Sequence, residues 1–121
     1  MRRTSFIESF GCAFAGIAHA FISGRNFKVQ SGIAILAIVL GIAFAISPIE
    51  WAVIALCIGV VLGGECVNTA IEAVVDLVSP DYHELAKVAK DCAAGGVLIA
   101  SLASVAVAAF IFLPRFMTLF I

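Results

Sequence analysis

The sequence predicts an all-α membrane protein with an N-terminal amphipathic surface helix and three transmembrane helices. Of its 121 residues, 64% are hydrophobic and only 12% are charged, whereas about 25% of the residues in an ordinary soluble domain are charged. The mean hydropathy is +1.20. The apolar residues form three stretches that are each long enough to cross a bilayer.

Composition also limits the domain organisation and the partners. We expect a single domain over residues 1–121, because no polar stretch is long enough to enclose its own core. The net charge is −1 and no basic patch carries interleaved aromatic residues, so we expect no nucleic-acid partner. The cysteines form no C-x-x-C pair, which argues against a zinc site or a redox motif. Glu8 and His19 interrupt the apolar N-terminal segment, so we expect no cleaved signal peptide.

The first predicted element is an amphipathic helix over about residues 5–23. Large apolar residues recur there every three or four positions and share one stripe of the helix. They are Phe6, Phe10, Phe14, Ile17 and Phe21. We expect this helix to lie in the plane of the membrane surface. Its role is either simple anchoring and packing, or forming a wall beside a lipid substrate.

Three spans follow, over about residues 31–49, 51–78 and 93–113. The first starts after Arg25 and Lys28 and is expected to stop at Ser47-Pro48. The second starts with Trp51 as an interfacial anchor. It is longer than a hydrocarbon core of about 30 Å requires, so its cytoplasmic end is expected to protrude.

Serine and proline residues mark the boundaries of the last span. We expect Ser79 to be the N-cap of a new helix that has Pro80 at its first position. The pair Pro114-Arg115 is expected to close the third span.

Basic residues predict the orientation in the membrane, because lysine and arginine favour the cytoplasmic side. All but one of them lie before the first span or between the second and third spans, and we therefore expect a cytoplasmic N-terminus. These cytoplasmic residues are Arg2, Arg3, Arg25, Lys28, Lys87 and Lys90, and the exception is Arg115.

The second span carries three carboxylates and an amide where lipid should exclude them. Glu65, Asn68, Glu72 and Asp76 are spaced so that they fall within an arc of about 80° on a helix. An ionisable group at bilayer depth costs roughly a few kcal/mol or more unless it is paired, hydrated or facing a cavity. This shared polar face therefore predicts a functional site.

Each group on this face has a use in phosphoryl transfer. A carboxylate shielded from water accepts a proton readily, which suits Glu65 to act as a general base toward a hydroxyl group. Glu72, helped by Asn68 or Asp76, suits a Mg²⁺ ion whose other ligands are phosphate oxygens and waters. Lys90 is suited to neutralise phosphate charge. We therefore expect a membrane lipid alcohol and a polyphosphate to meet at the cytoplasmic rim.

The alternative is a structural polar seam. In that case Asn68 and Thr69 hydrogen-bond between helices, and the carboxylates pair with Lys87 and Lys90. His19 and His83 are more typical of packed or interfacial histidines than of metal ligands, because neither has a second histidine at ligand spacing.

The run Glu65–Asp76, followed by Tyr82-His83-Glu84-Leu85 and by Ala86–Asp91, resembles the prokaryotic diacylglycerol kinase family, which includes the undecaprenol kinases. The shared signature is E-x-x-N-[TS]-A-I-E-x-x-V-D, and the resemblance covers nearly the whole chain. It implies ATP-dependent phosphorylation of undecaprenol or diacylglycerol, with Mg²⁺, at the bacterial inner membrane. It also implies a homotrimeric helical bundle with active sites shared between protomers.

The resemblance also assigns roles to single residues. It implies that Glu65 is the catalytic base, that Asn68 orients the site and that Glu72 is a metal ligand. The positions that match nucleotide-contacting residues are Asp81, Tyr82, His83, Lys90 and Asp91. Tyr82 is equally suited to be an interfacial anchor.

Two positions depart from the family pattern. The residue before Arg25-Asn26-Phe27 is usually a glutamate that shares the metal, and here it is Gly24. A nucleotide-contacting arginine near the N-terminus is replaced by Ser5 in an ungapped alignment. Candidates to replace the arginine are Arg2, Arg3 and Arg25, and candidates to replace the metal ligand are Asp76 and Asp91.

Three other functions fit parts of the sequence. A family member that has lost activity through Gly24 would persist as a binding protein. A small ion- or proton-translocating oligomer explains Glu65 but not the charged residues gathered at the rim. A structural membrane subunit is favoured by Gly59-x-x-x-Gly63 and by the small residues of the third span, although these suit a kinase trimer equally.

Overall fold

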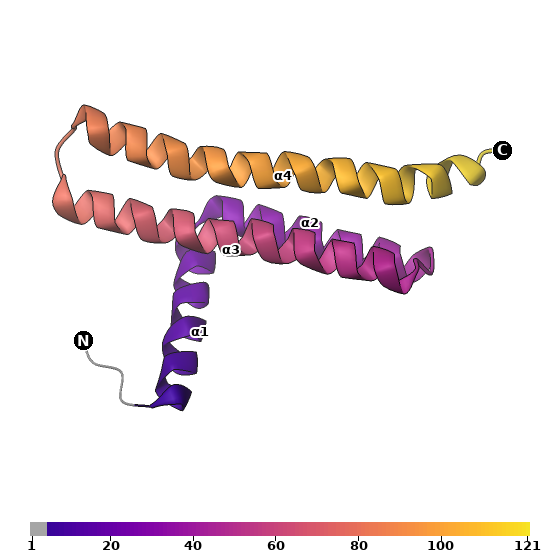
Figure 1. Cartoon of the computed structure of the whole chain (residues 1–121), viewed down its shortest axis with the longest axis horizontal. Helices are drawn as coiled ribbons and strands as arrows, with labels where there is room; N and C mark the ends of the chain where they lie inside the picture. The colour runs from indigo at the N-terminus through magenta and orange to yellow at the C-terminus, as the bar shows by residue number, and fades with distance from the viewer. Residues whose placement is uncertain (1–4) are drawn as a thin grey trace.

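The computed structural model describes residues 5–121, which form four α-helices and no strand (Figure 1). The helices are α1 (Phe6–Ser23), α2 (Arg25–Ala43), α3 (Pro48–Val78) and α4 (Glu84–Thr118). All four are long and apolar enough to cross a membrane. The predicted all-α membrane class is thus confirmed. Arg2 and Arg3, part of the predicted charge asymmetry, lie outside the described residues.

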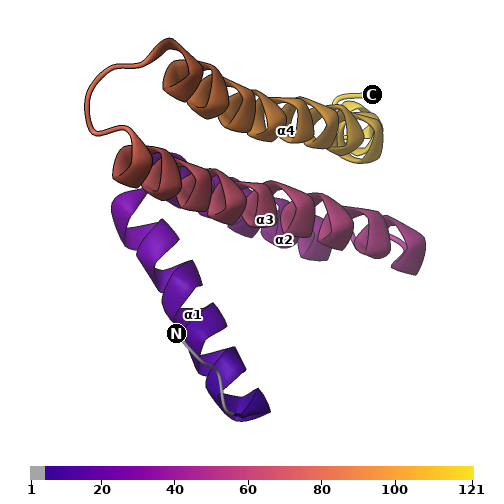
Figure 2. The same ribbon diagram turned by 60° about the vertical axis from the view of Figure 1, so that its left-hand side comes forward.

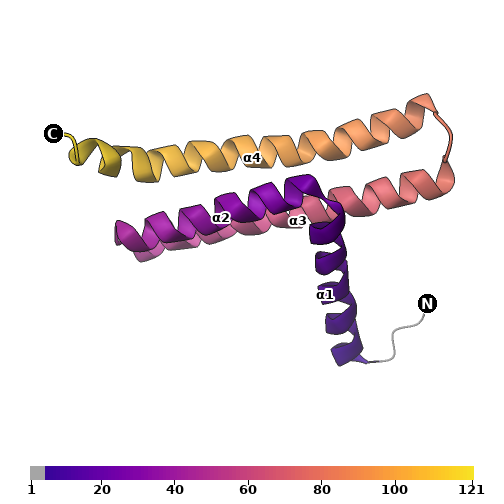
Figure 3. The same cartoon turned by 180° about the vertical axis from the view of Figure 1, so that it is seen from behind.

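Helix α3 is central, because it packs along both α2 and α4. A short turn joins α2 to α3 at one end, and a loop joins α3 to α4 at the other, so that neighbouring helices are antiparallel (Figures 1 and 2). Helix α1 runs across the direction of the other three, as Figure 3 shows from behind. This course suits the predicted surface helix. Its place in the membrane stays a prediction, because α1 is also long and apolar enough to span.

Gly24 forms the sharp corner between α1 and α2. It is extended (φ −103°, ψ 114°) and its N–H donates to the Ala20 carbonyl oxygen at 2.9 Å. A Cβ added at this position would lie 2.7 Å from the same oxygen. Any side chain here would therefore require the backbone to shift. The local structure of the corner thus favours glycine at this position.

The first span differs from its predicted bounds of 31–49, because α2 includes Arg25 and stops at Ala43. The stop is a Schellman motif. The N–H of Ala45 donates to the Ile42 carbonyl at 3.2 Å, and that of Ile46 to the Gly41 carbonyl at 3.1 Å. Ala45 has φ 51°, in the left-handed region.

Ser47 and Pro48 start α3 immediately after this turn. Ser47 is the N-cap, and it forms a capping box with Glu50 while Pro48 takes the first turn. Beyond the turn, a buried cluster joins α3 to the last third of α4. Its members are Ile46, Ile54, Ile111 and Phe112.

The prediction that Ser79 and Pro80 start the next helix is wrong. Ser79 instead ends α3, with its N–H donating to the Val75 carbonyl at 2.8 Å and its Oγ to the Asp81 carbonyl at 2.8 Å. Helix α4 begins after His83, whose Nδ1 accepts from the Leu85 N–H at 3.1 Å. A histidine thus performs the capping that serine was expected to provide.

The prediction that Pro114-Arg115 closes the last span is also wrong, because α4 continues to Thr118. Arg115 forms a bidentate ion pair with Glu50, in which Nη2 donates to Oε1 at 2.7 Å and Nη1 donates to Oε2 at 2.9 Å. Nη1 also donates to the Ile111 carbonyl at 2.7 Å. This clamp to the first turn of α3 holds the end of α4 in helical form beyond the proline.

The left-handed Ala45 generates a stability prediction. Ala45→Gly should raise the free energy of unfolding by about 1 kcal/mol, because glycine adopts this conformation without the Cβ penalty. Denaturant or thermal unfolding of the purified protein in detergent measures the change. The control Ala43→Gly, placed in the helical last turn of α2, should instead lower it by about 1 kcal/mol. A loss of stability in both variants would contradict the described turn.

Candidate functional site

A polar pocket of about 280 Å³ lies between α2, α3 and α4. Each of the three helices contributes polar side chains, and aliphatic residues complete the walls. The polar members of the lining are Asn26, Gln30, Glu65, Asn68, Glu72 and Ser101. Three of the predicted site residues are therefore brought together in one cavity.

Glu65 is the most enclosed charged residue of the site, with 4% of its surface exposed. Its Oε1 is buried and has no hydrogen-bond partner within the described part of the chain. Glu65 follows Pro48 by 17 positions, so it lies about 26 Å along α3 from the start of the helix. A buried carboxylate oxygen without a partner is costly, and this one is available to a ligand.

Asn68 and Glu72 form a pair on the same face of α3. The Asn68 Nδ2 donates to Glu72 Oε1 at 3.0 Å, which orients the amide. The Asn68 Oδ1 is buried and has no partner among residues 5–121. The two buried side-chain oxygens of this pocket that lack a partner among residues 5–121, one from Glu65 and one from Asn68, both come from the predicted polar face.

The structural-seam alternative is wrong for Asn68 and Thr69. Both side chains bond within α3, Asn68 to Glu72 and Thr69 Oγ1 to the Glu65 carbonyl at 3.0 Å. Among the carboxylates of this face in the described chain, only Asp76 pairs with another helix, where Lys90 Nζ on α4 lies 2.6 Å from Asp76 Oδ1 on α3. Interhelical pairing therefore involves the exposed end of the acidic face and not its buried part.

Lysine–aspartate pairs form the rim beyond the pocket. Besides Lys90–Asp76, Lys87 Nζ lies 2.5 Å from Asp91 Oδ2 on the same helix. Exposed pairs of this kind contribute about 0–1 kcal/mol, so a phosphate can compete for either lysine. None of these four residues lines the polar pocket.

Asp81, Tyr82 and His83 occupy the loop between α3 and α4. All three are exposed, Tyr82 to 80%. None of them lines the pocket. The single chain thus groups Glu65, Asn68 and Glu72 but leaves the predicted nucleotide-contacting residues outside their cavity.

Sequence reasoning missed three polar residues of the pocket. Asn26 was noted only within a segment shared with the family, and Gln30 lies just before the predicted start of the first span. Ser101 was read as one of the small packing residues of the last span. The available signal was a polar residue beside or inside an apolar stretch, but nothing in the sequence shows that these residues face Glu65.

The donor set suits a hard cation that is shared with a phosphate ligand. Mg²⁺ prefers oxygen ligands and usually takes one or two from the protein. Glu72 and the free Asn68 amide oxygen meet this requirement. Residues 5–121 contain no group of three His, Cys, Asp or Glu side chains placed to hold a metal by themselves. The site therefore fits an ion that arrives with its phosphate, and not a metal site made by protein alone.

Comparisons with known proteins identify the family of the chain. Residues 11–112 match the model of the family described as prokaryotic diacylglycerol kinase. The chain is 42% identical over 118 residues to a diacylglycerol kinase of Synechocystis, covering 97% of this chain and 67% of that protein. It is 40% identical over 110 residues to the undecaprenol kinase of Bacillus subtilis (91% and 89%) and 32% identical over 102 residues to the diacylglycerol kinase of Escherichia coli K12 (84% of each).

The chain belongs to the prokaryotic diacylglycerol kinase family. The resemblance inferred from the acidic run is thereby confirmed, and the chain is a lipid kinase with ATP as its phosphoryl donor. Four apolar helices in a member of this family make it a multi-pass protein of the bacterial inner membrane.

Proposed function

We propose that this kinase transfers the γ-phosphoryl group of ATP to the hydroxyl of undecaprenol or diacylglycerol at the cytoplasmic rim, giving the lipid monophosphate. The relatives bear the names of kinases for these two lipids. The observation that supports the proposal most is the buried, unpartnered Glu65 Oε1 in a polar pocket between three apolar helices.

In the proposed reaction Glu65 is the general base. The lipid hydroxyl gives its proton to Glu65 as its oxygen forms a bond with the γ-phosphorus. The bond between that phosphorus and the bridging oxygen breaks, and ADP leaves. A well-placed general base contributes about 10²–10⁴-fold to such a rate. Asn68 positions Glu72 through their 3.0 Å hydrogen bond.

Glu72 and the Asn68 amide oxygen are the residues that would hold Mg²⁺. The ion would supply charge neutralisation on the phosphates of ATP. Lys90 would exchange Asp76 for a phosphate oxygen, which its exposed position permits. Asp81, Tyr82, His83 and Asp91 remain proposed nucleotide contacts. Their separation from the pocket favours a site that is completed by the nucleotide or by a second protomer.

We further propose a cytoplasmic N-terminus. Lys87 and Lys90 lie at the α3–α4 loop end of the bundle, and Arg25 and Lys28 begin α2 on the side of that end (Figure 1). Arg115 lies at the opposite end and is paired with Glu50. The larger number of lysine and arginine residues at the loop end therefore supports a cytoplasmic location for this end and the pocket.

A homotrimer is part of the proposal. Gly59 and Gly63 on α3 and Gly95 and Gly96 on α4 have no atoms within 4 Å of a built Cβ. Small residues without neighbours permit close approach of helices from another copy. Residues 1–121 are proposed to act as a single domain within that assembly.

The carboxylate roles generate a test. Glu65→Gln should lower lipid-dependent ATP turnover at least about 100-fold, because it removes the proton acceptor. Glu72→Gln should lower turnover and raise the Mg²⁺ concentration required for half-maximal rate. ATP hydrolysis in detergent, with and without lipid alcohol, measures both effects. The exposed Glu84→Gln serves as the matched control with near-normal turnover. Full turnover in both pocket variants would refute the assigned site.

Gly24 generates a second test. If Gly24 occupies the place of a metal-sharing glutamate, Gly24→Glu should reduce the Mg²⁺ concentration required for half-maximal turnover severalfold. Because any Cβ there lies against the Ala20 carbonyl, Gly24→Ala is needed to separate the backbone shift from the carboxylate. An unchanged Mg²⁺ dependence in Gly24→Glu would count against the alignment.

A catalytically impaired member of the family is the second candidate. It is favoured by Gly24, whose tight corner excludes a side chain in the described backbone. ATP turnover by the unmodified protein separates the two candidates. Lipid-dependent turnover supports the kinase, and nucleotide or lipid binding without turnover supports the impaired member.

A further inference from the structure

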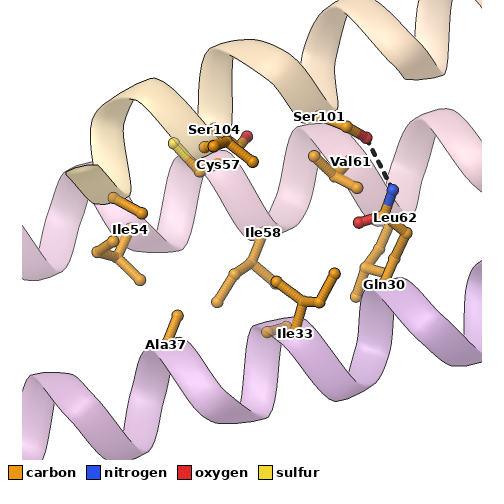
Figure 4. Close-up of a pocket in the computed structure, with 13 residues that line it drawn as sticks. Gln30, Ile33, Ala37, Ile54, Cys57, Ile58, Val61, Leu62, Ser101 and Ser104 are labelled. Carbon is orange, nitrogen blue, oxygen red and sulfur yellow. Dashed lines mark hydrogen bonds between the residues drawn. The ribbon is translucent and has the colours of Figure 1, made fainter.

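A second cavity continues from the polar pocket between the same three helices. It encloses about 190 Å³ and is lined mainly by aliphatic side chains (Figure 4). Within residues 5–121, Gln30 and Ser101 are the two residues that line both cavities. They mark the boundary between a polar compartment with Glu65 and an apolar one.

Gln30 and Ser101 are also bonded to each other across this boundary. Gln30 Nε2 on α2 donates to Ser101 Oγ on α4 at 2.8 Å (Figure 4). No other hydrogen bond described for residues 5–121 joins these two helices. We call this bonded pair the neck. It joins α2 and α4, which otherwise pack mainly against α3.

The apolar cavity begins one helical turn from the proposed base. Val61 and Leu62 of the apolar cavity precede Glu65 on α3 by one turn, or about 5 Å. A lipid alcohol with its hydroxyl at Glu65 therefore places its next few atoms at the neck and its hydrocarbon in the apolar cavity.

The apolar cavity is narrow. A cavity of about 150 Å³ holds one molecule of benzene, so 190 Å³ accepts the first segment of one hydrocarbon chain. This favours a single-chain alcohol over one that brings two acyl chains to the same place.

We propose that Gln30 and Ser101 are specificity-determining residues that favour a polyprenol over a diacylglycerol. The inference rests on the proposed function. The atoms next to a polyprenol hydroxyl are carbon and hydrogen and need no partner at the neck. A diacylglycerol carries ester oxygens there, which lose water on entry, and one of the two N–H donors of the Gln30 amide is already bonded to Ser101. An unpaired polar group in a dry site disfavours that substrate.

The test is a competition between undecaprenol and a dioleoylglycerol in the same detergent micelles, with the full chain, Mg²⁺ and ATP. The ratio of the two phosphorylated products is measured. Loss of folded enzyme lowers the amounts of both products by the same factor and leaves this ratio unchanged. The unmodified protein should form mostly the polyprenol phosphate.

Ser101→Ala should raise the share of diacylglycerol product about fivefold, because the freed Gln30 amide can donate to an ester oxygen. Adding Gln30→Leu to Ser101→Ala removes that donor and should return the ratio to the original value or below. The matched control is Ser104→Ala, one turn along α4, whose hydroxyl bonds to the Ala100 carbonyl of its own helix. It should leave the ratio unchanged.

An unchanged ratio in Ser101→Ala, or a raised ratio that Gln30→Leu does not reverse, would overturn the proposal. The same result is expected if a neighbouring copy of the chain fills the apolar cavity. If the unmodified protein phosphorylates neither lipid, the proposed function fails and this inference with it. If the protein phosphorylates the lipids but the product ratio does not respond to these substitutions, only the proposed role of the neck is overturned.

Discussion

The exclusion of water by the bilayer around α3 is the constraint on which the rest of the site depends. In a bilayer a carboxylate needs a partner, a hydrated cavity or a ligand, and Glu65 Oε1 has no protein partner among the described residues. The fold answers with a polar pocket made from three helices, in which Asn68, Glu72, Gln30 and Ser101 gather around that oxygen's cavity. The same exclusion of water makes a neighbouring apolar cavity suitable for hydrocarbon.

Much of this arrangement could be predicted because membrane helices have strong sequence signals. Apolar length predicted the three long helices, and the three-four-four spacing of Glu65, Asn68, Glu72 and Asp76 placed them on one face. Helix ends were predicted less well. Ser79 and Pro114 are residue types that are common at helix boundaries. Ser79, however, bonds to the Asp81 carbonyl in the loop instead of starting α4, and the Arg115–Glu50 pair holds α4 helical beyond Pro114.

The pocket was predictable only on the α3 side. The periodicity of one helix shows which of its residues share a face, but it does not show which residues of other helices meet that face. Asn26 and Gln30 enter the site because the corner at Gly24 directs α2 along α3. Ser101 enters because α4 returns antiparallel from the loop, at a register determined by packing around Ile54 and Phe112. These contacts depend on the tertiary arrangement of the helices and have no signal in the local sequence.

The clamp between Glu50 and Arg115 divides the α3–α4 hairpin into two mechanically different ends. Its bidentate geometry fixes the end away from the α3–α4 loop, where both partners are partly shielded. At the other end residues 79–83 connect the two helices covalently, and the ion pair beside this loop, Lys90–Asp76, is exposed. The Glu50–Arg115 pair therefore holds together the end of the hairpin that no loop connects.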